Sequence, residues 1–157
     1  MPLADPYASV DIPPELVHQF FGVFARLEHA MKVGGFQRRG RGGRAEGDWD
    51  GLINKVGDWI QVAPGSALDA AILYLINEPP QVQMFEAGWQ DKALKGDSPI
   101  ARAVDGARRV RNNLFHGGKH NPEKYEGRDK RLVGAALTVL LAAIETGPLA
   151  NCYNGLV

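Results

Sequence analysis

The sequence predicts an all-α protein in which four to five helices form a bundle within a single domain, residues 1–157. Three observations predict this fold class. Apolar residues recur at steps of three and four in several segments, as they do on the buried face of a helix. Capping residues or prolines precede these segments, and glycines or prolines follow them. No segment alternates between apolar and polar residues for long, as a half-buried strand would.

Two helices are expected in the first 60 residues. The first opens at Pro13-Pro14-Glu15 and ends at Gly34-Gly35. Its apolar positions follow helical spacing and are Leu16, Phe20, Phe24, Leu27 and Met31. Asp48 can cap a second helix, which carries apolar residues from Trp49 to Ile60.

A third helix is expected between Pro64-Gly65-Ser66, which supplies its cap, and Glu78-Pro79-Pro80, which stops it. Its inward positions are Leu68, Ala71, Ile72 and Leu75. Residues 81–96 show no clear period. We expect three of their apolar side chains to cover an edge of the core: Met84, Phe85 and Trp89.

The fourth helix is expected to start at Asp97-Ser98-Pro99 and to end at Gly117-Gly118. Its buried stripe comprises Ile100, Ala103, Val104, Ala107, and Val110 or Leu114. A last helix runs from about Asp129 to Thr146. The tail that follows, residues 147–157, is apolar enough to pack on the bundle or on a second subunit.

Residues 37–47 are rich in arginine and glycine and are expected to form a mobile loop, because such a composition cannot bury itself. Arginine-glycine segments bind single-stranded nucleic acid with little sequence preference, so this loop could be an RNA-gripping arm. The alternative, which we favour from the sequence, is a solvated connector.

The composition is that of a globular protein, with 45% apolar and 23% charged residues. Its formal net charge is zero, so any affinity for RNA must come from local patches. The only cysteine, Cys152, excludes an internal disulfide and suits a reducing cytoplasm. The longest apolar stretch, Leu132 to Ile144, is too short to span a membrane, and the N-terminus lacks signal-peptide features. We therefore expect a cytoplasmic protein without membrane contacts.

The segment that bears most on function runs from Arg108 to Lys119 and reads RRVRNNLFHGGK. An arginine can grip a phosphate with two parallel hydrogen bonds, and a histidine can give and take protons near neutral pH. Arg111 and His116 are five residues apart, about 140° around an ideal helix, so they do not share a face. Bringing them together requires a distorted helix end or a second subunit. In the alternative interpretation, Arg108 and Arg111 pair with acids such as Glu28, and His116 caps carbonyls.

The string RNNLFH, from Arg111 to His116, resembles the defining motif of the HEPN superfamily (higher eukaryotes and prokaryotes nucleotide-binding domains). The longer string RNNLFHGGK strongly resembles a bacterial and plasmid-borne subgroup of it. Glu78-Pro79-Pro80-Gln81 is similar to the same subgroup. The resemblance implies a helical bundle and a metal-independent, usually homodimeric ribonuclease acting on single-stranded RNA. Arg111 matches the motif arginine, Asn112 its polar partner and His116 its histidine.

By this resemblance, His116 is a general acid or base, Arg111 holds the scissile phosphate and Asn112 orients one of them. Glu28 matches an acidic position near the motif, where it could bond His116 or Arg111, or could instead form a solvent-facing ion pair. Two further cations are weaker candidates for phosphate contacts: Arg108 and Lys119. No metal or other cofactor is expected, since the spacing of the histidines does not suit a ligand set.

Two functions from different classes remain open. The first is an endoribonuclease that leaves a 2′,3′-cyclic phosphate, plausibly a toxin or phage-defence effector with an antitoxin partner. The second is a HEPN domain without catalysis, which binds RNA or nucleotide or serves as a helical interaction partner. The presence of both Arg111 and His116 favours the first.

Overall fold

The structure is a computed structural model that describes residues 1–3, 5, 11–115 and 127–156. It is mostly helical, with two small two-stranded sheets. The helices are α1 (Pro14–Val33), α2 (Trp49–Lys55), α3 (Ala67–Asn77), α4 (Pro99–Phe115), α5 (Arg128–Glu145) and α6 (Ala150–Asn154). The strands are β1 (Gln37–Arg39), β2 (Ala45–Gly47), β3 (Val82–Met84) and β4 (Gly88–Gln90). The prediction of a mostly helical domain is confirmed.

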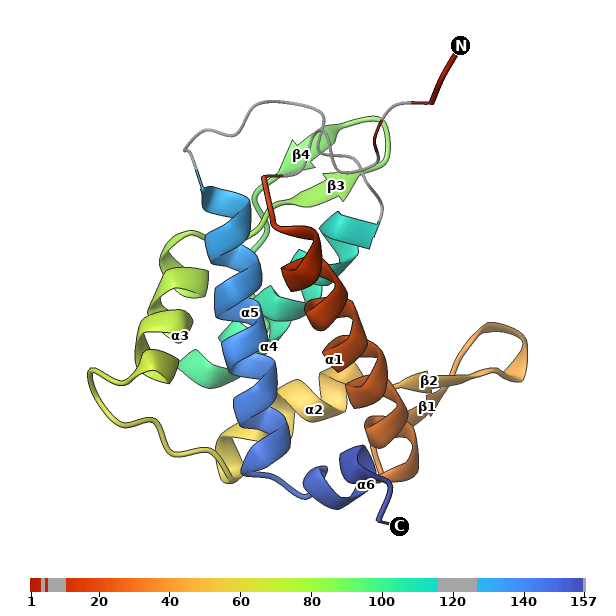
Figure 1. Cartoon of the computed structure of the whole chain (residues 1–157). Helices are drawn as coiled ribbons and strands as arrows, with labels where there is room; N and C mark the ends of the chain where they lie inside the picture. Colours follow the sequence, from red (N-terminus) through yellow and green to blue (C-terminus); the bar gives the residue numbers. More distant parts are fainter. Residues whose placement is uncertain (4, 6–10, 116–126, 157) are drawn as a thin grey trace.

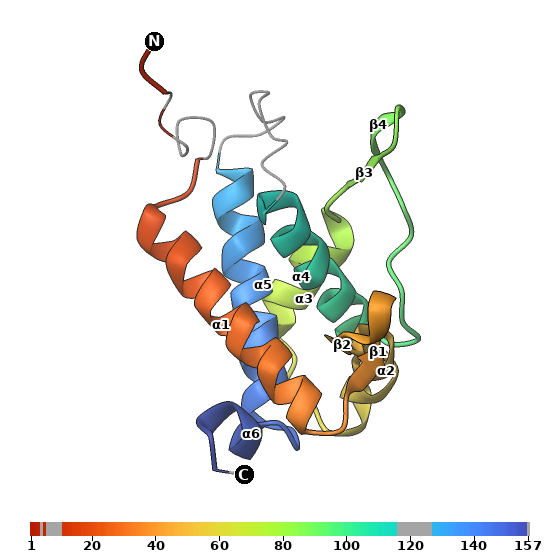
Figure 2. The same ribbon diagram turned by 90° about the vertical axis from the view of Figure 1, so that its right-hand side faces the viewer.

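Helix α5 is at the centre of the bundle and packs against α1, α3 and α4 (Figure 1). Its uncharged run lacks a polar face, which explains why it is buried on several sides. Hairpin β3–β4 stands at one end of the bundle and α6 at the other, as Figures 1 and 2 both show. Helix α2 and hairpin β1–β2 lie beside α4 and α1 respectively.

The expected helix starts are confirmed by their caps. The side chain of Asp48 accepts a hydrogen bond from the Gly51 amide at 3.0 Å, and Ser66 Oγ accepts one from the Asp69 amide at 3.1 Å. Ser98 Oγ does the same for the Ala101 amide at 3.2 Å. Each cap satisfies an amide that has no partner within its helix. These three local signals therefore fixed where α2, α3 and α4 begin.

The second helix is shorter than predicted. It ends at Lys55, and a 3₁₀ turn (Val56–Asp58) replaces its last part. Gly57 lies in that turn, and glycine disfavours a helix interior because it loses the most backbone freedom. Ile60 lies beyond the turn and is still buried. Its apolar side chain therefore indicated a buried position correctly, but not a helical one.

Residues 37–47, expected to be a loop, form a hairpin instead, in which β1 pairs antiparallel with β2. Gly42 and Gly43 have positive φ angles at its turn, and Arg38 pairs across the strands with Glu46. All of β1 is exposed, so no apolar alternation marked it as a strand. Its mobility stays a prediction. Figure 1 shows the hairpin projecting from the bundle.

Within residues 81–96, residues 82–90 form the second hairpin, β3–β4. The expectation that Phe85 covers the core is wrong, because this side chain at the tip is 89% exposed. Trp89 and Met84 are only partly buried. Each strand has only three residues, which is too short for the alternation of apolar and polar residues to be recognised in the sequence.

The C-terminal segment packs on the bundle, one of the two expected outcomes for the tail. Leu149 is fully buried and Cys152 nearly so, and α6 contacts α1. Among the described residues, no helix is long and apolar enough to cross a membrane. The expected helix stop at Gly117-Gly118 lies outside the described residues.

Candidate functional site

Arg111 lies near the C-terminal end of α4 and rests on two aromatic rings. Its guanidinium carbon is 5.0 Å from the ring centre of Phe24 and 4.8 Å from that of Phe115. Its Nη1 donates a hydrogen bond to Asn112 Oδ1 at 3.1 Å. The rings hold the planar group by cation–π attraction and leave its donors for other partners.

No carboxylate among the described residues forms an ion pair with Arg111. The interpretation in which Arg111 pairs with Glu28 is therefore wrong for this part of the chain. Glu28 instead accepts a hydrogen bond from Trp49 Nε1 at 3.0 Å, a bond that ties α1 to α2. It also faces a cavity, described below.

The neighbouring arginines of α4 point to different partners. Arg108 approaches Asp50 with 4.0 Å between Nη1 and Oδ1. Arg109 pairs with the buried Asp105 at 3.1 Å and donates to the carbonyls of Lys92 and Ala93 at 2.7 and 2.6 Å. Arg109 therefore holds a loop in place, whereas Arg108 is the one that faces the cavity.

Two of the predicted site residues, His116 and Lys119, lie outside the described residues. Within the motif, the structure thus places Arg111 and Asn112 together. Asn113 has a different partner. Its Nδ2 donates a hydrogen bond to the carbonyl of Gln81, just before β3, at 2.8 Å, and this bond fastens hairpin β3–β4 to α4.

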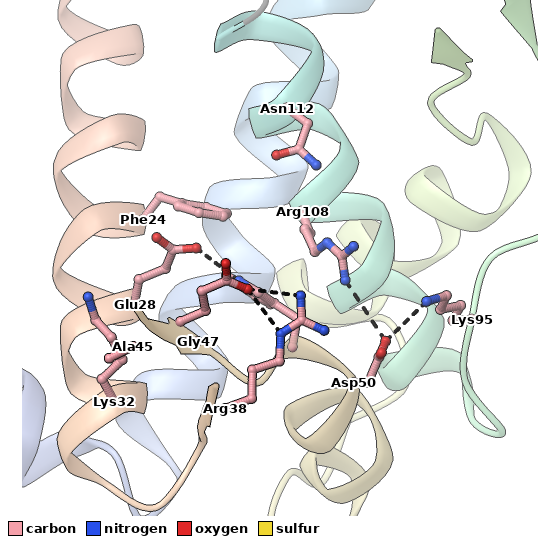
Figure 3. Close-up of a pocket in the computed structure, with 12 residues that line it drawn as sticks. Phe24, Glu28, Lys32, Arg38, Ala45, Gly47, Asp50, Lys95, Arg108 and Asn112 are labelled. Carbon is pink, nitrogen blue, oxygen red and sulfur yellow. Dashed lines mark hydrogen bonds and ion pairs between the residues drawn. The ribbon is translucent and has the colours of Figure 1, made fainter. Parts of the chain in front are cut away.

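A polar cavity of about 390 Å³ adjoins Asn112 between α1, hairpin β1–β2, α2 and α4 (Figure 3). Its lining contains four cations and three carboxylates, beside Asn112. The lining residues are Phe24, Glu28, Lys32, Arg38, Ala45, Glu46, Gly47, Trp49, Asp50, Lys95, Arg108 and Asn112. A second cavity, of about 550 Å³, is lined by hairpin β3–β4 and by Asn112 and Asn113 of α4.

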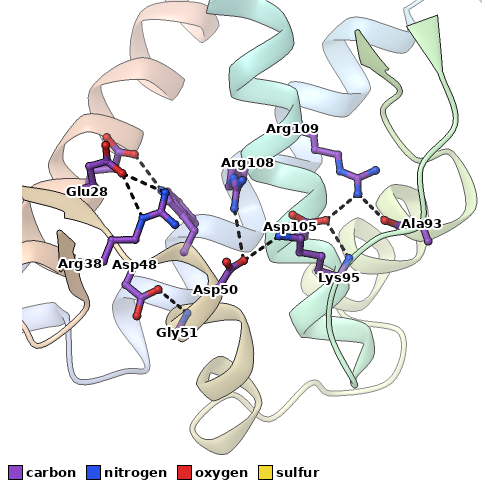
Figure 4. A network of polar contacts seen from close by, with 12 residues as sticks. Glu28, Arg38, Asp48, Asp50, Gly51, Ala93, Lys95, Asp105, Arg108 and Arg109 are labelled. Atoms are coloured by element: carbon purple, nitrogen blue, oxygen red, sulfur yellow. Dashed lines mark hydrogen bonds and ion pairs between the residues drawn. The ribbon is translucent and has the colours of Figure 1, made fainter. Parts of the chain in front are cut away.

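Asp50 is the electrostatic centre of the polar cavity. Its hydrogen bond from Lys95 Nζ, 3.1 Å long, lowers the pKa of Asp50 below its ordinary value. Burial opposes this shift and is the second-largest effect, and the charges of Lys95, Arg108 and Arg38 each lower the pKa further. Asp50 therefore stays ionised at neutral pH. Figure 4 shows the network of contacts around it.

The sequence did not identify Asp50, Lys95 or Arg38 as site residues. Arg38 belongs to the arginine-rich segment, whose positive charge is evident from the sequence. The sequence does not show which part of the fold this charge faces. Nothing in the local pattern marks Lys95 or Asp50, since they are 45 residues apart and meet only in the fold.

No group of three or more metal-ligating side chains occurs within the described part of the chain. Comparison of the chain with protein-family models, with curated proteins and with solved structures gave no match.

Proposed function

We propose that this protein is a metal-independent endoribonuclease of HEPN type, built on a HEPN-like bundle, that cuts single-stranded RNA. The observation that carries the proposal is the stacking of Arg111 without a carboxylate partner. Its guanidinium is held on two aromatic rings, and no carboxylate of the described chain neutralises it. An arginine that serves only stability would usually have an acidic partner when partly buried. This one keeps its charge for an anion.

The proposed reaction is attack of a ribose 2′-hydroxyl on the adjacent phosphorus. His116 takes the hydroxyl proton as general base, or protonates the departing 5′-oxygen as general acid. The new P–O bond forms as the P–O5′ bond breaks, leaving a 2′,3′-cyclic phosphate and a 5′-hydroxyl. Arg111 holds the phosphate as charge builds on its oxygens. Asn112 orients Arg111 through the hydrogen bond that joins them.

The supporting residues take revised roles in this proposal. Glu28 holds α1 to α2 through Trp49 and contributes negative charge to the cavity instead of contacting Arg111. Arg108 faces the cavity as a cation beside the motif. Lys119 follows the motif in sequence and stays a candidate phosphate contact. A homodimer with a shared cleft, and an antitoxin partner, belong to the same proposal.

The polar cavity favours a second candidate, a HEPN domain that binds RNA or nucleotide without cleaving it, as a binder or helical interaction partner. Four cationic side chains reach this cavity. They could hold phosphates without any contribution from His116. The second candidate needs no chemistry from the motif.

One experiment separates the two candidates. The purified protein is incubated with labelled single-stranded RNA in excess chelator, beside His116→Ala and Arg111→Ala. Arg26→Ala is the matched control, because it removes an exposed arginine that contacts the Tyr153 carbonyl on the side of α6. We expect wild type and the control to cut RNA with cyclic-phosphate ends. The two motif variants should lose activity by a factor of about 100 or more.

Binding without cleavage by wild type would support the second candidate. Equal cleavage by all four proteins would reveal a contaminating nuclease and contradict the assignment of the motif.

A further inference from the structure

Three cations from distant parts of the sequence converge on one carboxylate in the polar cavity. We call Arg38, Lys95 and Arg108 the cationic cluster. They come from β1, from the segment before α4 and from α4 itself, and all three lower the pKa of Asp50 by their charge. Figure 3 shows Arg108 and Lys95 reaching Asp50 from its two sides, with Arg38 further to the left.

Four cations and three carboxylates, Glu28 among them, line the cavity, which leaves an excess of one positive charge. Glu46 pairs with Arg38 at 3.1 Å, and Asp50 pairs with Lys95 at 3.1 Å but meets Arg108 only at 4.0 Å. Lys32, a fourth cation in the lining, has no ionic partner among the described residues. In a chain of zero net charge, this local excess is the kind of patch that attracts an anion.

The position of Lys95 is fixed by buried contacts of its own segment. Asp105, only 3% exposed, accepts a hydrogen bond from the Lys95 amide at 3.0 Å and pairs with Arg109. Gly96 lies so close to α4 that a Cβ would stand 2.6 Å from that of Ala101. The segment is therefore held against α4 before any ligand arrives, which lowers the entropy lost on binding.

The cavity adjoins the motif. Arg108 and Asn112 are four residues apart on α4, so they lie on one face and about 6 Å apart along the helix axis. Both line the cavity, and Asn112 also receives the hydrogen bond from Arg111. A strand whose phosphate sits at Arg111 can extend directly into the cavity.

We propose that the cationic cluster is a phosphate-binding subsite that holds the RNA backbone next to the bond that is cut. This inference rests on the proposed function, whose substrate it extends. A phosphate oxygen enters between Arg108 and Lys95, and Arg108 exchanges its long contact with Asp50 for a charge-assisted hydrogen bond. The subsite reads the backbone and not the bases, so it adds affinity without sequence preference.

The test measures binding without cleavage. A fluorescent 2′-O-methyl oligonucleotide, which cannot be cut by 2′-hydroxyl attack, is titrated in chelator at several salt concentrations and followed by anisotropy. Arg108→Ala and Lys95→Ala are each expected to weaken binding about tenfold and to flatten the salt dependence by about 0.7 per lost phosphate contact. Asp50→Asn is expected to tighten binding, because it removes the competing carboxylate.

Lys55→Ala is the matched control, since it removes a lysine from an exposed pair with Asp58 on α2 and leaves the cavity lining intact. Circular dichroism and thermal unfolding of each variant establish that it is folded. Equal weakening in the control and the cluster variants would show a general charge effect and overturn the subsite. So would weaker binding by Asp50→Asn.

The outcomes keep the two proposals apart. If wild type cleaves RNA while the cluster variants bind the oligonucleotide with unchanged affinity and salt slope, the subsite is wrong and the proposed function stands. If wild type cuts no RNA but binding still depends on the cluster, the cluster binds phosphate as proposed, while its place beside a cut bond and the ribonuclease are wrong.

Discussion

At the scale of single residues, the environment of Arg111 differs from that of its neighbours on α4. Arg109 is fastened by one carboxylate and two carbonyls, and Arg108 faces Asp50. Arg111 instead lies on the rings of Phe24 and Phe115. Stacking fixes the plane of its guanidinium without using up its hydrogen-bond donors, which is what bidentate recognition of a phosphate needs.

The substitution Arg111→Lys tests this interpretation. Lysine keeps the charge but loses both the stacking plane and the paired donors. We expect single-turnover cleavage to fall by about 100-fold, while affinity for the uncleavable oligonucleotide changes by less than about threefold. If Arg111→Lys cleaves RNA within a factor of two of the wild-type rate, a positive charge at this position is enough for cleavage and the stacked plane is not needed.

At the scale of elements, buried polar contacts join α4 to the segment that precedes it. Asp105 links the Lys95 amide to Arg109, and Arg109 reaches the carbonyls of Lys92 and Ala93. Both side chains are well shielded from solvent, with relative exposures of 4% and 12%. An ion pair in that setting is costly to break, because the remaining charge is left without compensation.

We therefore expect Asp105→Asn to lower the free energy of unfolding by about 3–5 kcal/mol. Urea titration followed by circular dichroism measures this change. The control is Asp58→Asn, which breaks an exposed pair with Lys55 and should cost less than about 1 kcal/mol. Similar losses in the two variants would contradict a structural role for the buried pair.

At the scale of the whole molecule, the proposed reaction requires Arg111 and His116 to meet at one phosphate. Ideal helix geometry puts positions five apart about 140° from one another, so one helix does not align them. A shared cleft would take the arginine from one subunit and the histidine from its partner. Such an arrangement makes assembly a condition for activity.

Mixing inactive variants tests the shared cleft. Arg111→Ala and His116→Ala are co-expressed with different tags, and the heterodimer is isolated. If each site combines residues of two subunits, one of its two sites has both residues intact, and activity should return to about half that of wild type. If both residues act within one subunit, both sites stay defective. No recovery in a verified heterodimer, or a monomer by light scattering at micromolar concentration, would rule out the shared cleft.

Much of the fold was predictable from local signals. The caps at Asp48, Ser66 and Ser98 and the proline stop after Glu78 set helix ends correctly, because they act through hydrogen bonds and backbone sterics within a few residues. The two hairpins were not predicted. Their strands have three residues each and depend on glycine turns and on contacts with α1 and α4, so no periodic signal announced them.

By itself, the sequence determined the helical class, most helix boundaries and the motif residues, because each of these rests on neighbours along the chain. Only the tertiary structure decided the surroundings of the motif. It placed the guanidinium of Arg111 on the ring of Phe24 and paired Glu28 with Trp49 through a hydrogen bond. It also brought Arg38, Lys95 and Arg108 close to Asp50. Electrostatic and stacking interactions depend on distance in space. Residues such as Glu28 and Trp49, 21 positions apart, or Asp50 and Lys95, 45 positions apart, come close only when the helices pack.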